Sequence, residues 1–80
     1  RTTNFVAVGT KTGITAGQTV SVTGIEGVKA DNSTDILISI HCIGSSGVDE
    51  LIAVTRTDGG FTLKNNSDTT RSVKYVVMRV

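Results

Sequence analysis

The 80-residue chain has no proline, no tryptophan, one cysteine and one histidine. Because Cys42 is the only cysteine, no disulfide can form within the chain. His41 and Cys42 together supply fewer than the three or four ligands that a zinc ion usually takes from a protein. A domain this short has a small core and usually needs a disulfide, a metal or oligomerisation to complete it. We therefore expect oligomerisation, and we expect neither a metal nor a cofactor.

Aromatic rings and an excess of charge of one sign are also lacking. The net charge is +1, acids and bases are mixed along the chain, and only three residues are aromatic. Nucleic-acid-binding proteins usually carry a basic stripe, and single-strand binders add aromatic platforms. No apolar run approaches the roughly 20 residues that a membrane-spanning helix needs, and no signal peptide is visible. The sequence thus predicts no nucleic-acid partner and no membrane partner.

The length and the first residue bear on domain organisation. Eighty residues suffice for one domain, which we place at residues 1–80. The chain starts at Arg1, and removal of an initiator methionine before so large a residue is not expected. We therefore expect the 80 residues to be a fragment of a longer chain, or a processed one.

Residues that favour β-strands are abundant. Val, Ile and Thr account for 31 of the 80 residues, and nine glycines supply turns. β-Branched side chains lose freedom in helices and pack well on a pleated sheet. Turn signals divide the chain into six short strands. We expect them at about Asn4–Val8, Gln18–Thr23, Ile36–Ile43, Glu50–Thr57, Phe61–Lys64 and Arg71–Val80, with a loop at Thr10–Gly17.

Two of these strands are apolar on both faces. In Ile36–Ile43 three isoleucines and Cys42 alternate with Leu37, Ser39, His41 and Ile43. In the last strand Val73, Tyr75 and Val77 alternate with Val76, Met78 and Val80. A strand of this kind is either central in a sheet or covered by a neighbouring subunit. The pattern predicts an all-β fold, a small antiparallel sandwich or barrel, completed by other copies of the chain.

The candidate residues for catalysis are His41 and Cys42. A nucleophilic cysteine needs a base beside it, but strand alternation directs these two neighbouring side chains to opposite faces. We interpret His41 as a partly buried histidine within the sheet and Cys42 as a small buried hydrophobic residue. The sequence therefore predicts no catalytic residue, and we expect that the chain is not an enzyme.

One polar loop is a candidate binding site. Asn65, Asn66, Asp68 and Arg71 lie close together in the sequence, in the connection between the last two strands and at the start of the last one, flanked by lysines. Such a loop can bind a sugar or a protein partner, and the alternative is an ordinary solvated loop.

The last third of the chain, with the strand entry Ile14–Val22, carries a family resemblance. Gly60–Ser67, a polar gap and Val73–Arg79 resemble the C-terminal hairpin of bacteriophage fibre, spike and head-decoration domains. Ile14–Val22 is similar to a strand entry common in viral and bacterial surface sandwiches. The ending also resembles that of H-type lectins, but it has Tyr75 where a tryptophan is usual and ends in Met78-Arg79-Val80 in place of small residues.

The resemblance implies a structural protein of a phage particle, such as a capsid decoration, spike or fibre module. It further implies a homotrimer that contacts other virion proteins and lies on the particle surface after assembly in the host cytoplasm. The alternative is a module that binds a cell-surface glycan or another host receptor. A third hypothesis is an unrelated immunoglobulin-like or adhesin module of a larger surface protein.

Overall fold

The structure, a computed structural model, describes residues 5–32, 34–44 and 47–80. Over these residues the chain forms six strands and one 3₁₀ turn. They are β1 (Phe5–Ile14), β2 (Thr19–Val22), β3 (Ile36–Cys42), the turn η1 (Asp49–Leu51), β4 (Ile52–Thr57), β5 (Gly60–Asn65) and β6 (Arg71–Arg79). No helix in the described ranges has the length and apolar character needed to span a bilayer.

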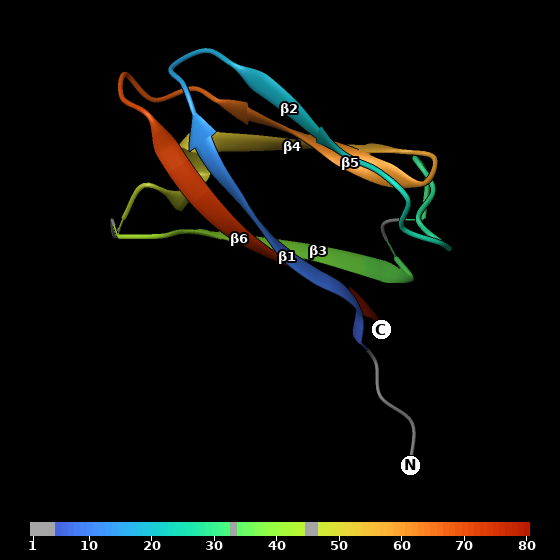
Figure 1. The fold of residues 1–80 in the computed structure, drawn as a ribbon. Coiled ribbons are helices and arrows are strands. Elements are labelled where there is room, and N and C mark those ends of the chain that lie inside the picture. The colour runs from blue at the N-terminus through green and yellow to red at the C-terminus, as the bar shows by residue number, and fades with distance from the viewer. Residues whose placement is uncertain (1–4, 33, 45–46) are drawn as a thin grey trace.

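The strands form two antiparallel sheets of three strands each. Sheet A has the order β1-β6-β3, and sheet B has the order β2-β5-β4. Figure 1 shows the two sheets as separate layers, with β2, β5 and β4 above β1, β6 and β3. Every connection except the β4–β5 turn passes from one sheet to the other. The predicted all-β fold is confirmed, and its form is a sandwich.

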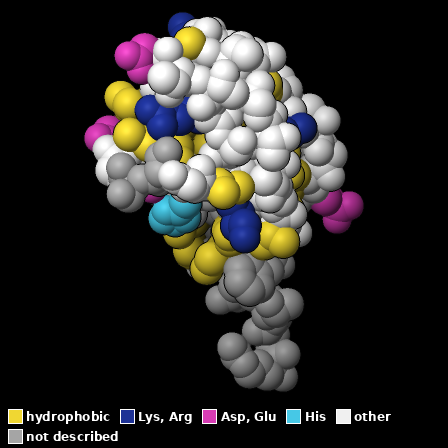
Figure 2. Space-filling model, turned by 60° about the vertical axis from the view of Figure 1, so that its left-hand side comes forward, with side chains coloured by type: hydrophobic (Ala, Val, Ile, Leu, Met, Phe, Trp, Pro, Cys, Tyr) yellow, Lys and Arg dark blue, Asp and Glu magenta, His cyan; other side chains and the backbone are white. Residues whose placement is uncertain are grey.

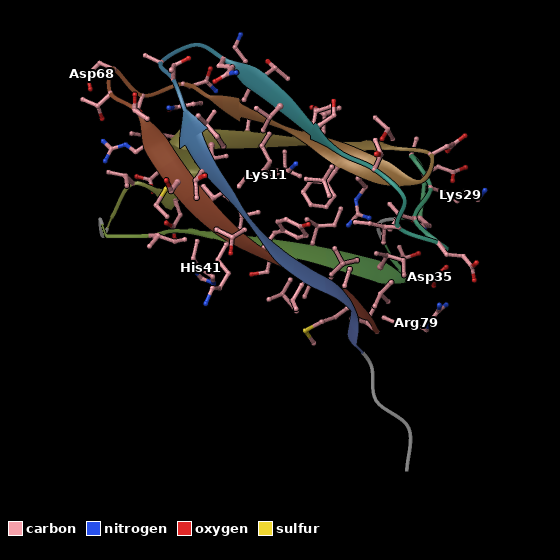
Figure 3. The ribbon with its side chains drawn as sticks, in the orientation of Figure 1. Lys11, Lys29, Asp35, His41, Asp68 and Arg79 are labelled. Atoms are coloured by element: carbon pink, nitrogen blue, oxygen red, sulfur yellow. The ribbon has the colours of Figure 1, made fainter. Side chains whose placement is uncertain are left out.

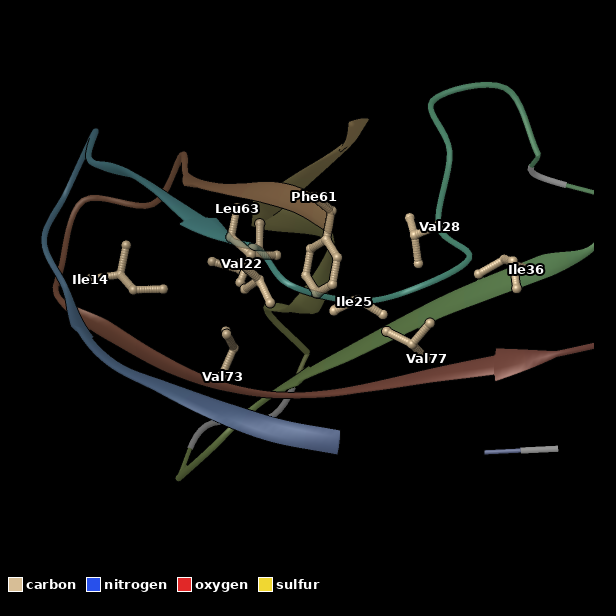
Figure 4. Packing of buried hydrophobic residues seen from close by; sticks show 10 residues of the cluster. Ile14, Val22, Ile25, Val28, Ile36, Phe61, Leu63, Val73 and Val77 are labelled. Carbon is tan, nitrogen blue, oxygen red and sulfur yellow. The ribbon is translucent and has the colours of Figure 1, made fainter. Parts of the chain in front are cut away.

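The core lies between the sheets and follows from alternation along the two central strands. Phe61 and Leu63 of β5 and Val73 and Val77 of β6 are completely buried. Tyr75 packs edge-on against Phe61, with ring centroids 5.3 Å apart. Additional apolar residues come from the connections and the edge strands (Figure 4): Ile14, Val22, Ile25, Val28, Ile36 and Ile52.

The first strand is longer than the sequence predicted. β1 continues to Ile14, so the prediction of a loop from Thr10 is wrong for residues 10–14. Gly13 has φ +67°, and the pairing with β6 shifts register between Lys11 and Ile14. This irregularity lets the strand bend and still bury Ile14. Asn4, where we expected the strand to begin, lies outside the described residues.

The third strand is not central in its sheet, which was one of the two arrangements that its apolar pattern allowed. β3 is an edge strand, and β6 is the central strand of sheet A. Alternation reports which faces of a strand are apolar, but the same pattern arises in a central strand and in an edge strand that another chain covers. The fourth strand also begins later than predicted, because Asp49–Leu51 forms the 3₁₀ turn.

Candidate functional site

The outer face of sheet A combines apolar side chains with a lysine and a histidine. Cross-strand register aligns Val8 of β1 with Val76 of β6 and Ser39 of β3, and aligns Met78 with Leu37. Val8 is 64% exposed and Leu37 is 48% exposed. We call this surface the A face, and its members are Val8, Thr10, Leu37, Ser39, His41, Ile43, Lys74, Val76 and Met78.

The outer face of sheet B has a different composition. The same register argument aligns Ser21 of β2 with Thr62 of β5 and Thr55 of β4. The next row is Thr19, Lys64 and Ala53. This B face therefore consists of hydroxyl-bearing residues, one lysine and one alanine. Its side chains can all be hydrated at little cost, whereas exposed valine and leucine favour burial against a partner.

The A face has a shallow hollow at its β1–β6 side. Val8, Gly9, Thr10, Lys74 and Val76 line it. Figure 2 shows hydrophobic side chains gathered next to the histidine, with a cationic side chain beside them. The surface can thus receive an apolar side chain from a partner, with positive charge at its border.

His41 lies at the polar end of the A face. Its side chain points away from the space between the sheets (Figure 3) and is 71% exposed. The prediction that His41 is partly buried is therefore wrong, because no layer formed by the described residues covers the outer side of β3 at this position. His41 Nδ1 lies 3.1 Å from Asp49 Oδ2, and Ser39 Oγ lies 3.5 Å from His41 Nε2.

Asp49 joins η1 to β3. Its Oδ1 accepts a hydrogen bond of 2.8 Å from the backbone N–H of Cys42. This hydrogen bond, helped by the contact with His41, lowers the pKa of the Asp49 carboxyl below its usual value. Because water surrounds most of the imidazole, we interpret the Ser39–His41–Asp49 series as a surface contact that fixes η1 against β3.

Cys42 lies on the opposite side of β3 from His41, as alternation predicted. It is partly buried and packs against the core. Burial raises the pKa of the Cys42 thiol, and the nearby Asp49 carboxylate raises it further. The thiol therefore stays protonated at neutral pH, which makes it a poor nucleophile. Within the described ranges, no three His, Cys, Asp or Glu side chains lie close enough together to hold a metal ion.

The four residues of the candidate binding loop lie at the end of the sandwich where β5 leads into β6. Asn66 and Asp68 are exposed, Arg71 is partly buried and Asn65 is fully buried. Arg71 Nε donates to Ser67 Oγ at 3.2 Å. A ligand at this loop can thus reach the side chains of Asn66 and Asp68 directly, but not that of Asn65.

Asn65 instead fastens the loop to the rest of the fold. Its Nδ2 donates to the carbonyls of Ile14 and Thr69, each at 2.8 Å. Its Oδ1 accepts from the backbone N–H and from Oγ of Ser67, at 2.9 and 2.6 Å. All hydrogen atoms of the amide are therefore used within the chain, and Asn65 ties β5 to the end of β1 and to the 66–70 loop.

The burial of Asn65 could have been predicted from the sequence. Asn65 has the same parity as Phe61 and Leu63, so extending the fifth strand by one residue would have placed it inside. Val8 carried no such signal, because its place on the A face depends on the pairing of β1 with β6. Comparisons with protein-family models, with curated proteins and with solved structures found no match.

Proposed function

We propose that this chain is a structural module of a bacteriophage particle, a capsid decoration, spike or fibre component, that acts by self-association through the A face. The observation that carries the proposal is the contrast between the two outer faces. The B face is polar, whereas the A face exposes Val8 and Leu37 beside Val76 and Met78. An apolar surface on one side of a small sandwich is typical of an interaction site.

The occupant that we favour is a second copy of the same chain. Without a disulfide, an 80-residue sandwich gains stability when its apolar surface is buried against a partner. The resemblance of the C-terminal hairpin to phage particle domains supports a homotrimer that contacts other virion proteins on the particle surface. Assembly in a reducing host cytoplasm agrees with a single cysteine that packs against the core.

The proposed module works through contacts and not through catalysis. A catalytic cysteine needs a base beside it, but His41 lies on the opposite side of β3 from Cys42. Here the imidazole of His41 is mainly exposed, and the thiol of Cys42 is held in its protonated form.

The alternative, binding of a glycan or host receptor, depends on the 65–71 loop. The exposed side chains of Asn66 and Asp68 favour it. The burial of Asn65 weakens it, because the most densely hydrogen-bonded amide of the loop faces inward. Tyr75, the aromatic residue of the last strand, packs against Phe61 and so does not form a surface platform for a sugar ring.

Sedimentation equilibrium tests the self-association. We expect the wild-type chain to have the mass of a trimer, or of two trimers where a second contact joins them. We expect the double variant Val8→Ser, Val76→Ser to form no trimer, with unchanged circular dichroism. The matched control is Thr55→Ser, Thr62→Ser on the B face, which should keep the mass of the wild type. A wild-type chain that stays monomeric as its concentration rises would refute self-association.

Two further measurements separate the candidate functions. Mass spectrometry of purified particles of the phage that encodes the chain should detect it in a fixed ratio to a major capsid or tail protein. A glycan array probed with wild type and with Asn66→Ala, Asp68→Ala should show no binding that the double variant removes. Glycan binding that this variant abolishes would support the alternative.

A further inference from the structure

The four edge strands of the sandwich differ in how well they are protected against pairing with another strand. Natural proteins protect sheet edges with bulges, with very short strands and with charged residues that point inward. β1 has two register shifts and places Lys11 in line with the buried Val73. β2 is only four residues long. β4 directs Arg56 inward, in register with Phe61.

β3 has none of these protections. It is seven residues long and pairs with β6 without a register shift. Its inward positions are three isoleucines and Cys42, and it contains neither proline nor any Asp, Glu, Lys or Arg. β3 therefore lacks the features that protect the other three edge strands, and its edge is the one open to pairing with another strand.

The hydrogen bonds of β3 show which backbone groups face that edge. Ile43 N–H donates to Ser72, and Val80 N–H donates to Asp35, so the odd-numbered residues bond to β6. In an antiparallel ladder alternate residues direct both backbone groups to the same side. The N–H and C=O groups of Ile36, Ile38, Ile40 and Cys42 therefore point to the free edge.

Both ends of this edge are already occupied by the chain itself. Ile36 N–H donates to the carbonyl of Asn32, and Ile36 C=O accepts from the guanidinium of Arg56. Cys42 N–H donates to Asp49. Between these ends, within the part of the chain that the structure describes, no hydrogen bond reaches the edge-facing groups of Ile38 and Ile40.

We propose that the free edge of β3 pairs with β3 of a second copy, antiparallel, about a twofold axis at Ser39. In that register Ile38 lies opposite Ile40 of the second copy, and Ile40 lies opposite its Ile38. Each N–H of these two residues donates to the facing C=O, so the open groups of Ile38 and Ile40 are all used. The C=O of Cys42 faces an Ile36 N–H that Asn32 already holds. A register shifted by one pair would in addition place an open group of Ile38 or Ile40 against one that Arg56 or Asp49 already holds.

This contact is distinct from the proposed contact through the A face. The A-face contact would close a ring of fixed size, the proposed trimer. A second contact of twofold symmetry, at the β3 edge, would join two such rings. The edge contact would join two A sheets into one six-stranded sheet. Leu37 would then lie beside His41 of the second copy on the outer side, so that no like charges face each other.

Cysteine crosslinking tests both the edge and the register. Ser39 would face Ser39 of the second copy as a non-hydrogen-bonded pair, with Cα atoms about 4.5 Å apart. A disulfide spans Cα separations of about 4.4–6.8 Å. We expect Ser39→Cys in a Cys42→Ala background to form a covalent dimer under mild oxidation, with loss of the monomer band on a non-reducing gel. The matched control is Thr55→Cys, Cys42→Ala, in the middle of the protected edge β4, which should remain a monomer on that gel.

Adding Val8→Ser and Val76→Ser separates this proposal from association through the A face. If the edge contact is real, the Ser39→Cys chain still crosslinks when those two changes have removed the A-face contact. Crosslinking of Ser39→Cys that is no faster than that of Thr55→Cys would overturn the proposal, whatever the mass of the wild-type chain. Crosslinking that disappears with Val8→Ser and Val76→Ser would assign it to the A face and equally overturn the edge contact.

Discussion

Sheet A and sheet B have the same number of strands but differ in how far one chain completes them. Sheet B has a hydroxyl-rich outer face, a short or protected strand at each edge and a buried amide that ties its central strand to β1. Sheet A has exposed valine and leucine on its outer face and an unprotected edge at β3. Under the proposed function, folding alone completes sheet B, whereas sheet A is completed by association with other copies of the chain.

This comparison predicts that changes in sheet B lower the free energy of unfolding, whereas changes on the outside of sheet A alter assembly. Gly60→Ala should have the largest effect. A Cβ at this position would lie 1.8 Å from the backbone oxygen of Val22, so β2 would have to move away from β5. We expect a loss of about 3 kcal/mol or more, measured by urea unfolding.

Gly9→Ala in sheet A is the matched control for this prediction. A Cβ there would meet the ring end of Tyr75 at 2.4 Å, and a side chain can move where a backbone strand cannot. The expected loss is about 1–2 kcal/mol. An equal or larger loss for Gly9→Ala would contradict the expectation that the clash with a backbone strand costs more than the clash with a side chain.

Asn65→Ala should have the next largest effect. It removes the hydrogen bonds of a fully buried amide and leaves the Ser67 hydroxyl and two carbonyls without these partners. We expect a loss of about 2–4 kcal/mol in the free energy of unfolding. The neighbouring exposed Asn66→Ala should change it by less than about 0.5 kcal/mol. Similar losses for both variants would show that Asn65 does not fasten the loop.

Making the B face apolar should affect assembly more than folding. Thr55→Val, Thr62→Val gives the B face an apolar patch where the wild type has two hydroxyls. We expect the free energy of unfolding to change by less than about 1 kcal/mol for the pair but a new concentration-dependent species by light scattering. If this variant shows the same mass as the wild type at every concentration, an apolar outer face alone does not cause association.

The smallest effect concerns pH and the contact between η1 and β3. The folded-state pKa of Asp49 lies below its ordinary value of 3.8. The stabilisation is therefore fully present above that ordinary value and is lost as the pH falls through the lower, folded-state value. We expect the difference in urea midpoint between wild type and Asp49→Asn to shrink over this acidic range. Asp68→Asn, which removes a charge without the contacts to Cys42 and His41, should show no such trend.

The sequence allowed the strands and their faces to be predicted, because alternation is a local property. Phe61 and Leu63 proved to be buried, and Cys42 and His41 proved to lie on opposite sides of β3. Strand order could not be read in the same way. The apolar pattern of Ile36–Ile43 agreed with a central position and with a covered edge, and only the pairing with β6 decided between them.

The candidate site shows the same division. The apolar outer residues of the third and last strands were visible in the sequence, but Val8 joins them only through the register of β1. The second half of β1 was predicted to be a loop, because a glycine such as Gly13 among polar residues is typical of loops. Asn65 was read as a surface residue because asparagine is usually exposed, and its burial depends on carbonyls that lie up to 51 residues away.

The pairing of β1 with β6 has a mechanical consequence. Phe5 at the start of β1 faces Met78 near the end of β6, so both strands leave the sheet at the same end (Figure 1). A tensile force that pulls these two ends apart would load the hydrogen bonds of the β1–β6 ladder one after another, starting at that end. Under the proposed association, a neighbour packed across the A face would add to the resistance that the β1–β6 ladder offers to such a force.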